Sequence, residues 1–412
     1  MKPSLKSKVD NTNFQEWLTT ATSLSNTIFF AIDLRPYEKQ LIALQQAKTS
    51  RECAIFLGCK IGQQLATLLM EHHAVIFPNI TGRPYPIYRK SLYTVDELFS
   101  GYDPNVPESR EQTLDWRIFL DENEIANYNQ SLENPKFAKF NTEEYLARTL
   151  HDYFIQEQLD RYLEQFNSPM HRGIIAIMGG HGVLRSELTY HQMAMISRQL
   201  TRDGFLIASG GGEGLMEAAN LGAWFAPLRD DEMNNAIAML SINGADSTDN
   251  PLWLSTAWKV RNDTLHYHFS KRRNLSVSTW LFNAQNVFAT DIAKFFEYSL
   301  REQVLISIAK QGMIYAEGSS GTLQEIFESA FQNQYNQDTY KYYTPMICFG
   351  EGYWDPNANK NSNFPNNGKP VWPLLLKLAQ EAHFEHCLLK TSDPNAVIEF
   401  IRNFKYTSTL PT

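Results

Sequence analysis

The hydrophobic residues of this chain are spaced in two patterns, and both are clearest after Pro169. There, short apolar runs alternate with longer segments in which apolar residues recur every three or four positions. Short runs are typical of strands buried on both faces of a sheet, and the longer period is typical of helices. We predict strands over residues 174–178, 205–209, 236–242, 313–316 and 345–349. We predict helices over residues 188–203, 215–224, 291–310, 322–334, 372–382 and 395–404. The alternation predicts an α/β fold with a Rossmann-like, doubly wound parallel sheet.

A smaller α/β pattern precedes this one. Short β-branched and aromatic runs predict strands over residues 27–34, 54–57 and 74–77. Helical spacing is present over residues 61–70 and 143–166, whereas Pro, Tyr and Gly predict a loop over residues 84–112. We therefore divide the chain into an N-terminal α/β extension of unassigned role (residues 1–140), a linking helix (residues 141–169) and a Rossmann-like domain (residues 170–405).

Composition and charge narrow the function classes. The 412 residues are 43% hydrophobic and 20% charged, as in ordinary globular proteins. A net charge of −8 without a basic run argues against nucleic acid as a partner. No apolar run is long enough to span a bilayer and no apolar segment follows the basic start, so we expect no membrane partner, no signal peptide and a cytoplasmic location. The four cysteines and the histidine pairs lack metal-ligand or disulfide spacing, so we expect no metal and no cofactor.

Three glycine-rich segments carry the candidate chemistry, because each follows a predicted strand and opens onto a predicted helix. They are residues 179–182 (GGHG), 209–214 (SGGGEG) and 318–322 (GSSGT). In a doubly wound sheet such loops share the carboxyl edge of the strands, where glycine lets backbone approach a ligand and helix N-termini favour phosphate. Tight turns and helix caps are the alternative explanation for each loop alone, and none matches G-x-G-x-x-G or a P-loop. The candidate phosphate-binding residues are Gly179, Gly180, His181, Gly210, Gly211, Gly212, Gly214, Gly318, Ser319, Ser320, Gly321 and Thr322.

These segments resemble the LOG (Lonely Guy) family. Residues 209–223 (SGGGEGLMEAANLGA) look like its GGG-x-G-[IL]-M-E-A-A-N-x-G-A segment, and residues 318–325 (GSSGTLQE) are similar to its P-G-G-x-G-T-x-x-E. Residues 345–354 resemble the strand and Gly-Tyr turn that follow. The resemblance covers roughly residues 170–405 and implies a nucleotide phosphoribohydrolase that works as a homodimer without a cofactor.

The resemblance also implies catalytic residues. Glu325 occupies the glutamate position of G-T-x-x-E, and the family carries an Arg-Lys pair on a preceding helix. Arg272 and Arg301 both compete for that arginine; Arg301 is preferred because it lies just before the predicted strand. The chain departs from the family pattern at three positions, where it has Glu302 for lysine, Glu317 for proline and Ser319 for the second glycine.

The chemistry of these side chains suits glycosidic cleavage. A carboxylate one turn into a phosphate-binding helix can reach the ribose and stabilise an oxocarbenium-like transition state or orient water. Arg301 can bind phosphate or stabilise the leaving base, and Glu217 is expected to assist from the second loop.

We therefore expect hydrolysis of nucleoside 5′-monophosphates, N6-modified adenylates among them, to free base and ribose 5-phosphate. The alternative is a nucleotide-binding or sensor protein of the wider SLOG group, which binds without turnover. A third hypothesis is a structural partner whose N-terminal domain reads the ligand state. The cluster Thr113-Leu114-Asp115-Trp116-Arg117 is interpreted as packing between the domains.

Overall fold

The computed structural model describes residues 7–47, 54–119, 142–166, 171–242, 249–265, 269–280, 284–335, 343–355, 357 and 368–405. The chain falls into two compact units: a smaller one made of Met1–Lys90 and Phe140–Phe154, and a larger one made of Ser91–Lys139 and Ile155–Thr412. The helix α6 (Thr142–Glu164) contributes to both units. This division differs from the predicted boundary at residue 140, because residues 91–119 belong with the larger unit.

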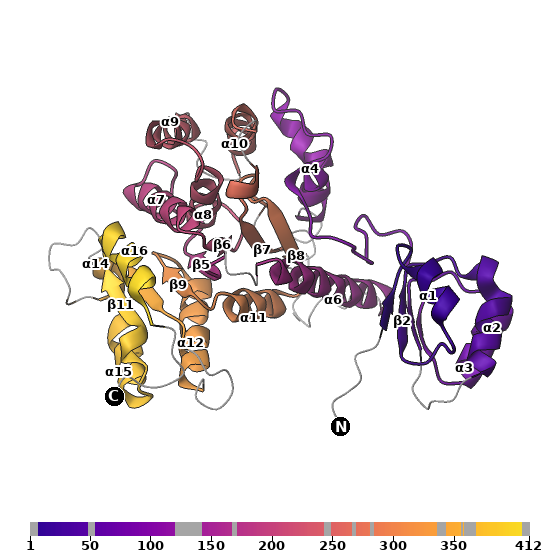
Figure 1. The fold of residues 1–412 in the computed structure, drawn as a ribbon. Coiled ribbons are helices and arrows are strands. Elements are labelled where there is room, and N and C mark those ends of the chain that lie inside the picture. The colour runs from indigo at the N-terminus through magenta and orange to yellow at the C-terminus, as the bar shows by residue number, and fades with distance from the viewer. Residues whose placement is uncertain are drawn as a thin grey trace, which may run out of the picture. The chain divides into compact units, whose positions relative to one another are not determined.

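The larger unit is built on a parallel sheet in the order β11-β10-β9-β5-β6-β7-β8, drawn in magenta to yellow in Figure 1. Its strands are β5 (Ile174–Met178), β6 (Leu206–Ser209), β7 (Leu275–Thr279), β8 (Asp291–Phe295), β9 (Gly312–Tyr315), β10 (Met346–Phe349) and β11 (Leu388–Thr391). The chain first adds strands on one side of β5 and then returns to place β9 on its other side. That reversal is the topological switch point of a doubly wound sheet.

Helices lie on the larger sheet in two groups (Figure 1). In one group α7 packs against α8 and α16, and in the other α12 packs against α11 and α15. The helices are α4 (Val95–Leu98), α7 (Leu188–Arg202), α8 (Leu215–Trp224), α9 (Asp230–Leu240), α10 (Leu252–Asp263), α11 (Tyr298–Ile308), α12 (Ser320–Gln334), α14 (Glu351–Trp354), α15 (Trp372–Glu381) and α16 (Pro394–Asn403). Short 3-10 helices are η2 (Pro107–Gln112), η4 (Phe269–Lys271) and η5 (Glu385–Cys387). Every residue of β5, β6, β7, β9 and β10 is buried, which explains their apolar runs. The predicted Rossmann-like α/β fold is confirmed.

Two predicted elements of this unit were wrong. Residues 236–242 were expected to form a strand, but 236–240 lie in α9, whose buried side chains Met233, Ile237 and Leu240 recur at helical spacing. Residues 291–310 were expected to form one helix, but the chain forms β8 first and then α11. Asp291 and Lys294 gave β8 the polar spacing of an amphipathic helix, and Lys294 is buried only because it pairs with Asp115.

The smaller unit has its own parallel sheet, in the order β1-β2-β3-β4. Its strands are β1 (Ser7–Val9), β2 (Thr27–Phe30), β3 (Ile55–Leu57) and β4 (Val75–Phe77). Its helices are α1 (Phe14–Thr20), η1 (Arg35–Tyr37), α2 (Glu38–Gln46) and α3 (Gln63–Glu71). Phe29 and Phe56 stack at 4.8 Å between ring centroids, with Trp17 edge-on to Phe29. This unit therefore has a hydrophobic core of its own. In neither unit do the described residues include a helix both long and apolar enough to cross a membrane.

Candidate functional site

The three glycine loops meet at the carboxyl ends of β9, β5 and β6, which are neighbours in the sheet. The backbone N–H of Gly180 donates to Glu317 O at 2.7 Å, and Gly180 O accepts from Leu215 N–H at 3.2 Å. Gly214 has a φ of +66°, and a Cβ there would overlap the carbonyl oxygen of Gly180. Glycine at 214 is therefore required both by the backbone conformation and by the close approach of the first loop.

A hollow of about 630 Å³ opens where the loops meet. This volume is in the range of small-molecule sites. It is lined by these predicted site residues: Gly179, Gly180, His181, Gly210, Arg301, Ser319, Ser320, Gly321, Thr322 and Glu325. It is also lined by five residues that were not predicted to belong to the site: Met216, Thr279, Tyr298, Glu302 and Gln324. Most of the predicted set is thus brought together in one place.

Arg301 and Glu325 meet inside this hollow. Arg301 Nη1 lies 3.5 Å from Glu325 Oε1 and also contacts Oε1 of Glu302, while Nε donates to Val277 O at 2.8 Å. Only 5% of Arg301 and 6% of Glu325 are exposed. A Cβ on Gly210 would overlap Arg301 Nη2, so the second loop needs glycine there to admit the guanidinium.

The electrostatics of the hollow favour a protonated carboxyl group. Burial raises the pKa of Glu325 well above its usual value, and the neighbouring charge of Glu302 adds to the rise, whereas Arg301 opposes it. The pKa of Tyr298 is also raised, by burial first and then by Glu302. A carboxyl group whose pKa is raised toward neutrality is suited to general acid or base catalysis.

The helix α12 presents its N-terminus to the hollow. Ser319 is its N-cap residue but its side chain makes no capping hydrogen bond, and Ser319 and Ser320 are exposed. The first backbone N–H groups of a helix have no intrahelical acceptor, and the helix dipole favours an anion near them. Gly318 does not line the hollow; its carbonyl oxygen accepts a hydrogen bond from the Tyr353 hydroxyl, which fixes the loop from behind.

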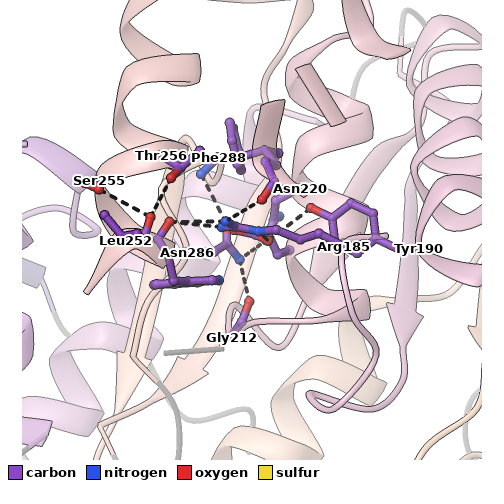
Figure 2. A network of polar contacts seen from close by, with 12 residues as sticks. Arg185, Tyr190, Gly212, Asn220, Leu252, Ser255, Thr256, Asn286 and Phe288 are labelled. Carbon is purple, nitrogen blue, oxygen red and sulfur yellow. Dashed lines mark hydrogen bonds and ion pairs between the residues drawn. The ribbon is translucent and has the colours of Figure 1, made fainter. Parts of the chain in front are cut away.

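Gly211, Gly212 and Gly214 form the frame of the second loop and do not line the hollow. The buried Asn286 side chain donates to the carbonyl oxygens of Gly211 at 2.9 Å and Gly212 at 3.1 Å, and to Asn220 Oδ1 at 2.9 Å. Figure 2 shows Asn286 between Gly212 and Asn220. This support could not be predicted from local patterns, because Asn286 lies far along the chain from the loop.

The prediction that Glu217 assists in the site was wrong. Glu217 is fully buried and pairs with Arg185 through two hydrogen bonds of 2.6 and 2.7 Å, while the Tyr190 hydroxyl donates to it at 3.0 Å (Figure 2 shows Arg185 beside Tyr190). Both oxygens of its carboxylate therefore accept hydrogen bonds within the protein, and Glu217 does not line the hollow. Glutamate in the first turn of α8 serves here as an anchor for the Arg185 segment.

Two other candidate groups also lie elsewhere. Arg272, the competitor of Arg301, is buried with its guanidinium 4.3 Å from the Trp224 ring centroid, and it does not line the hollow. The cluster at residues 113–117 was interpreted as packing between domains, but Asp115 is buried within the larger unit against Lys294 and the backbone N–H of Gln285. The described residues contain no group of three or more His, Cys, Asp or Glu that could hold a metal ion. His266 and His268 lie outside the described residues.

Of the lining residues that the sequence analysis missed, two had a detectable signal. Tyr298 lies one helical turn before Arg301, on the same face of α11, and Thr279 ends β7. The alternation of residues 275–279 (LSVST) would have predicted β7 and placed Thr279 at the same sheet edge.

Comparisons with known proteins add little. No protein-family model matches the sequence, and no curated protein matches it. Among solved structures, the chain is similar to a molybdenum cofactor binding protein from the phototrophic bacterium Rippkaea orientalis. The two are 15% identical with a TM-score of 0.32, and the match covers 57% of this chain and 97% of that one.

Proposed function

We propose that the larger unit hydrolyses the N-glycosidic bond of nucleoside 5′-monophosphates, giving free base and ribose 5-phosphate. The observation that carries the proposal is the 3.5 Å approach of Arg301 to Glu325 within a hollow lined by all three glycine loops. These residues were selected from sequence patterns separated by long stretches of chain, and their convergence supports a common role.

In this proposal the 5′-phosphate binds at the N-terminus of α12. The backbone N–H groups after Ser319, with the hydroxyl groups of Ser320 and Thr322, supply donors for its oxygens. Glu325 lies one turn further into the same helix, so its carboxyl group reaches the sugar when the phosphate sits at the helix end. Arg301 stabilises negative charge on the phosphate or on the departing base.

The test is incubation of the purified full chain with purine and pyrimidine 5′-monophosphates, including N6-modified adenylates, followed by chromatography of the products. We expect release of free base and ribose 5-phosphate, and no release from nucleosides that lack the phosphate. Glu325→Gln is expected to lower the rate by about 10²-fold or more. Unchanged base release in this variant would remove Glu325 from the reaction.

Glu328→Gln is a matched control. Glu328 lies on the same helix, less than one turn beyond Glu325, but it does not line the hollow. The Glu328→Gln variant also replaces a carboxyl group by an amide on α12, and we expect it to keep most of the activity. Equal losses in both variants would indicate damage to α12 rather than loss of a catalytic group.

A second candidate function is nucleotide binding without turnover. One observation favours it: Glu302 and Val277 O already engage the Arg301 guanidinium, leaving fewer donors for a ligand. Tight retention of a nucleoside monophosphate in calorimetry, with no base released over a long incubation, would support this function and exclude the hydrolase.

We also propose that the protein acts as a homodimer in the cytoplasm. The support for the homodimer is the resemblance of residues 170–405 to the LOG family, and the support for the location is that no apolar run is long enough to span a bilayer. Light scattering during size-exclusion chromatography tests the assembly, and a monomeric mass would contradict it.

A further inference from the structure

The side chain of Glu302 has no role in the proposed reaction so far, yet it lies at the centre of the site. It lines the hollow, and only 1% of the residue is exposed. Its Oε1 contacts Arg301 Nη1, while its Oε2 is buried without a hydrogen-bond partner among the described residues. A buried carboxylate oxygen without a donor costs free energy, and Tyr298 and Glu325 are the neighbouring groups whose protons can reach the Glu302 side chain.

The balance of charged side chains in the hollow indicates that one of its carboxyl groups keeps a proton. Of the described residues that line it, Arg301 is the one permanent cation, and it serves both Glu302 and Glu325. With both carboxyl groups ionised, the buried trio would carry a net negative charge. Two carboxylates that share a site cannot easily ionise together, and one of them keeps its proton to a higher pH.

The groups around Glu325 also raise its pKa and so favour a retained proton. Burial raises the pKa of Glu325, and Glu302 raises it further both by its charge and by a hydrogen bond. Glu328, from the same helix as Glu325, adds a smaller effect of the same sign.

Two tyrosines near the hollow do not supply a second positive charge. Tyr298 on α11 and Tyr315 on β9 have raised pKa values and stay neutral. His181 lines the hollow from the first loop and is exposed.

We infer that Glu302 and Glu325 form a pair that shares one proton, and that this pair is the general acid that protonates the departing base. The role of the pair as a general acid rests on the proposed hydrolase function, whereas the shared proton does not. Glu302 would thus be a second catalytic carboxyl group at the position where the resembling family has lysine.

In the reaction, the C1′–N bond breaks and its electron pair goes to the base nitrogen, which takes the shared proton of the pair. Water then forms the C1′–O bond and releases a proton to the pair of carboxylates, which restores the starting state. Nucleotide and water are consumed, and base and ribose 5-phosphate are produced, with no further reactant required.

The decisive experiment is the pH dependence of kcat/KM for the best nucleotide substrate, in the full chain and in Glu302→Gln. A general acid must be protonated, so activity falls as pH rises through its pKa. Replacing the Glu302 charge lowers the pKa of Glu325, so the alkaline limb of the profile is expected to move to lower pH. Glu328→Gln, the control, is expected to shift this limb less. A lowered rate in Glu302→Gln with the alkaline limb unmoved would overturn the inference and leave the hydrolase function standing.

A second measurement does not require turnover. Infrared difference spectra of protein labelled with ¹³C-glutamate report protonated carboxyl groups through their carbonyl stretch. We expect a band at neutral pH that disappears in Glu325→Gln and titrates at lower pH in Glu302→Gln. If the chain releases no base from any nucleotide, the proposed function fails and the acid role fails with it, while this band alone supports the shared proton. Absence of the band at neutral pH would overturn the pair whether or not the chain is a hydrolase.

Discussion

Arg301 Nη1 lies 3.5 Å from Glu325 Oε1, and the two side chains come from the helices that precede and follow strand β9 in the chain. The helix α11 ends just before β9, and α12 begins just after it. The pair is therefore positioned by one continuous segment of chain, in which α11, β9, the third glycine loop and α12 follow one another. Because both residues also contact the same hollow, they are expected to act as a unit.

Substitutions at the two positions should consequently be non-additive. We expect Glu325→Gln and Arg301→Met each to lower base release by about 10²-fold or more, and the double variant to be little worse than the worse single one. Steady-state kinetics on the four forms measure this directly. If the two losses multiply in the double variant, the residues act independently.

Stability should depend on pH through Glu325. Its pKa in the folded chain is raised well above the ordinary value of 4.5, so the folded state holds a proton that the unfolded state releases. The contribution of this group is favourable below about pH 4.5 and is lost as pH rises toward its folded pKa. Glu325→Gln cannot ionise, so its unfolding free energy should increasingly exceed that of the natural chain as pH rises above 4.5. Denaturant unfolding of both forms across this pH range tests the sign, and a difference that is constant with pH would contradict it.

The buried pair of Glu217 and Arg185 should matter for stability and not for chemistry. Glu217→Ala leaves the Arg185 charge buried and unpaired, which is expected to lower the unfolding free energy by about 3–5 kcal/mol. Replacing both residues by methionine removes the unpaired charge and should recover part of this loss. Urea unfolding gives the comparison. A Glu217→Gln variant that folds normally but has lost base release would restore the catalytic interpretation.

Asn286 should act on ligand binding through the second glycine loop. Asn286→Ala removes the side-chain donor to Gly211 O and Gly212 O; Gly211 O keeps the backbone N–H of residue 286 at 2.8 Å, whereas Gly212 O loses this donor, at a cost of about 1–3 kcal/mol. We expect KM for the nucleotide to rise more than kcat falls, because the reacting groups Arg301 and Glu325 are held by other elements. Asn286→Asp keeps the size of the side chain but loses its donors, and it should behave like the alanine variant. A fall in kcat alone would argue against this positioning role.

The sequence was sufficient to predict the elements that carry the glycine loops. β5 and α8 were predicted with the bounds that they have, because an all-apolar buried strand and a glycine-delimited helix are strong local patterns. It was insufficient to predict that Ser276 and Ser278 of β7 are buried, because their burial depends on Gln285, whose side-chain oxygen accepts hydrogen bonds from both hydroxyl groups. A local pattern cannot show that a distant side chain will satisfy a polar strand residue.

The same limit explains the outcome for individual site residues. Glu325 and Arg301 were predicted because the G-T-x-x-E segment and the helix before its strand resemble the corresponding parts of the LOG family. Glu217 has a similar position after the second loop, yet Arg185 and Tyr190 reach it from the preceding loop and helix. Which glutamate faces a ligand and which faces a buried arginine is decided by tertiary contacts that spacing does not encode.

The position of β9 beside β5 also determines at which stage of folding the site can form. Ile174 N–H donates to Gln311 Oε1 across 137 residues, and Gly180 pairs with Glu317 only after β9 is in place. During synthesis, β5, β6 and the first two loops emerge well before the helix and strand that bring Arg301, the third loop and Glu325. Closing such a long loop is slow compared with forming local helices. Ligand binding will therefore report the completion of folding, and chains that end before β9 will lack the site even where their early strands have paired.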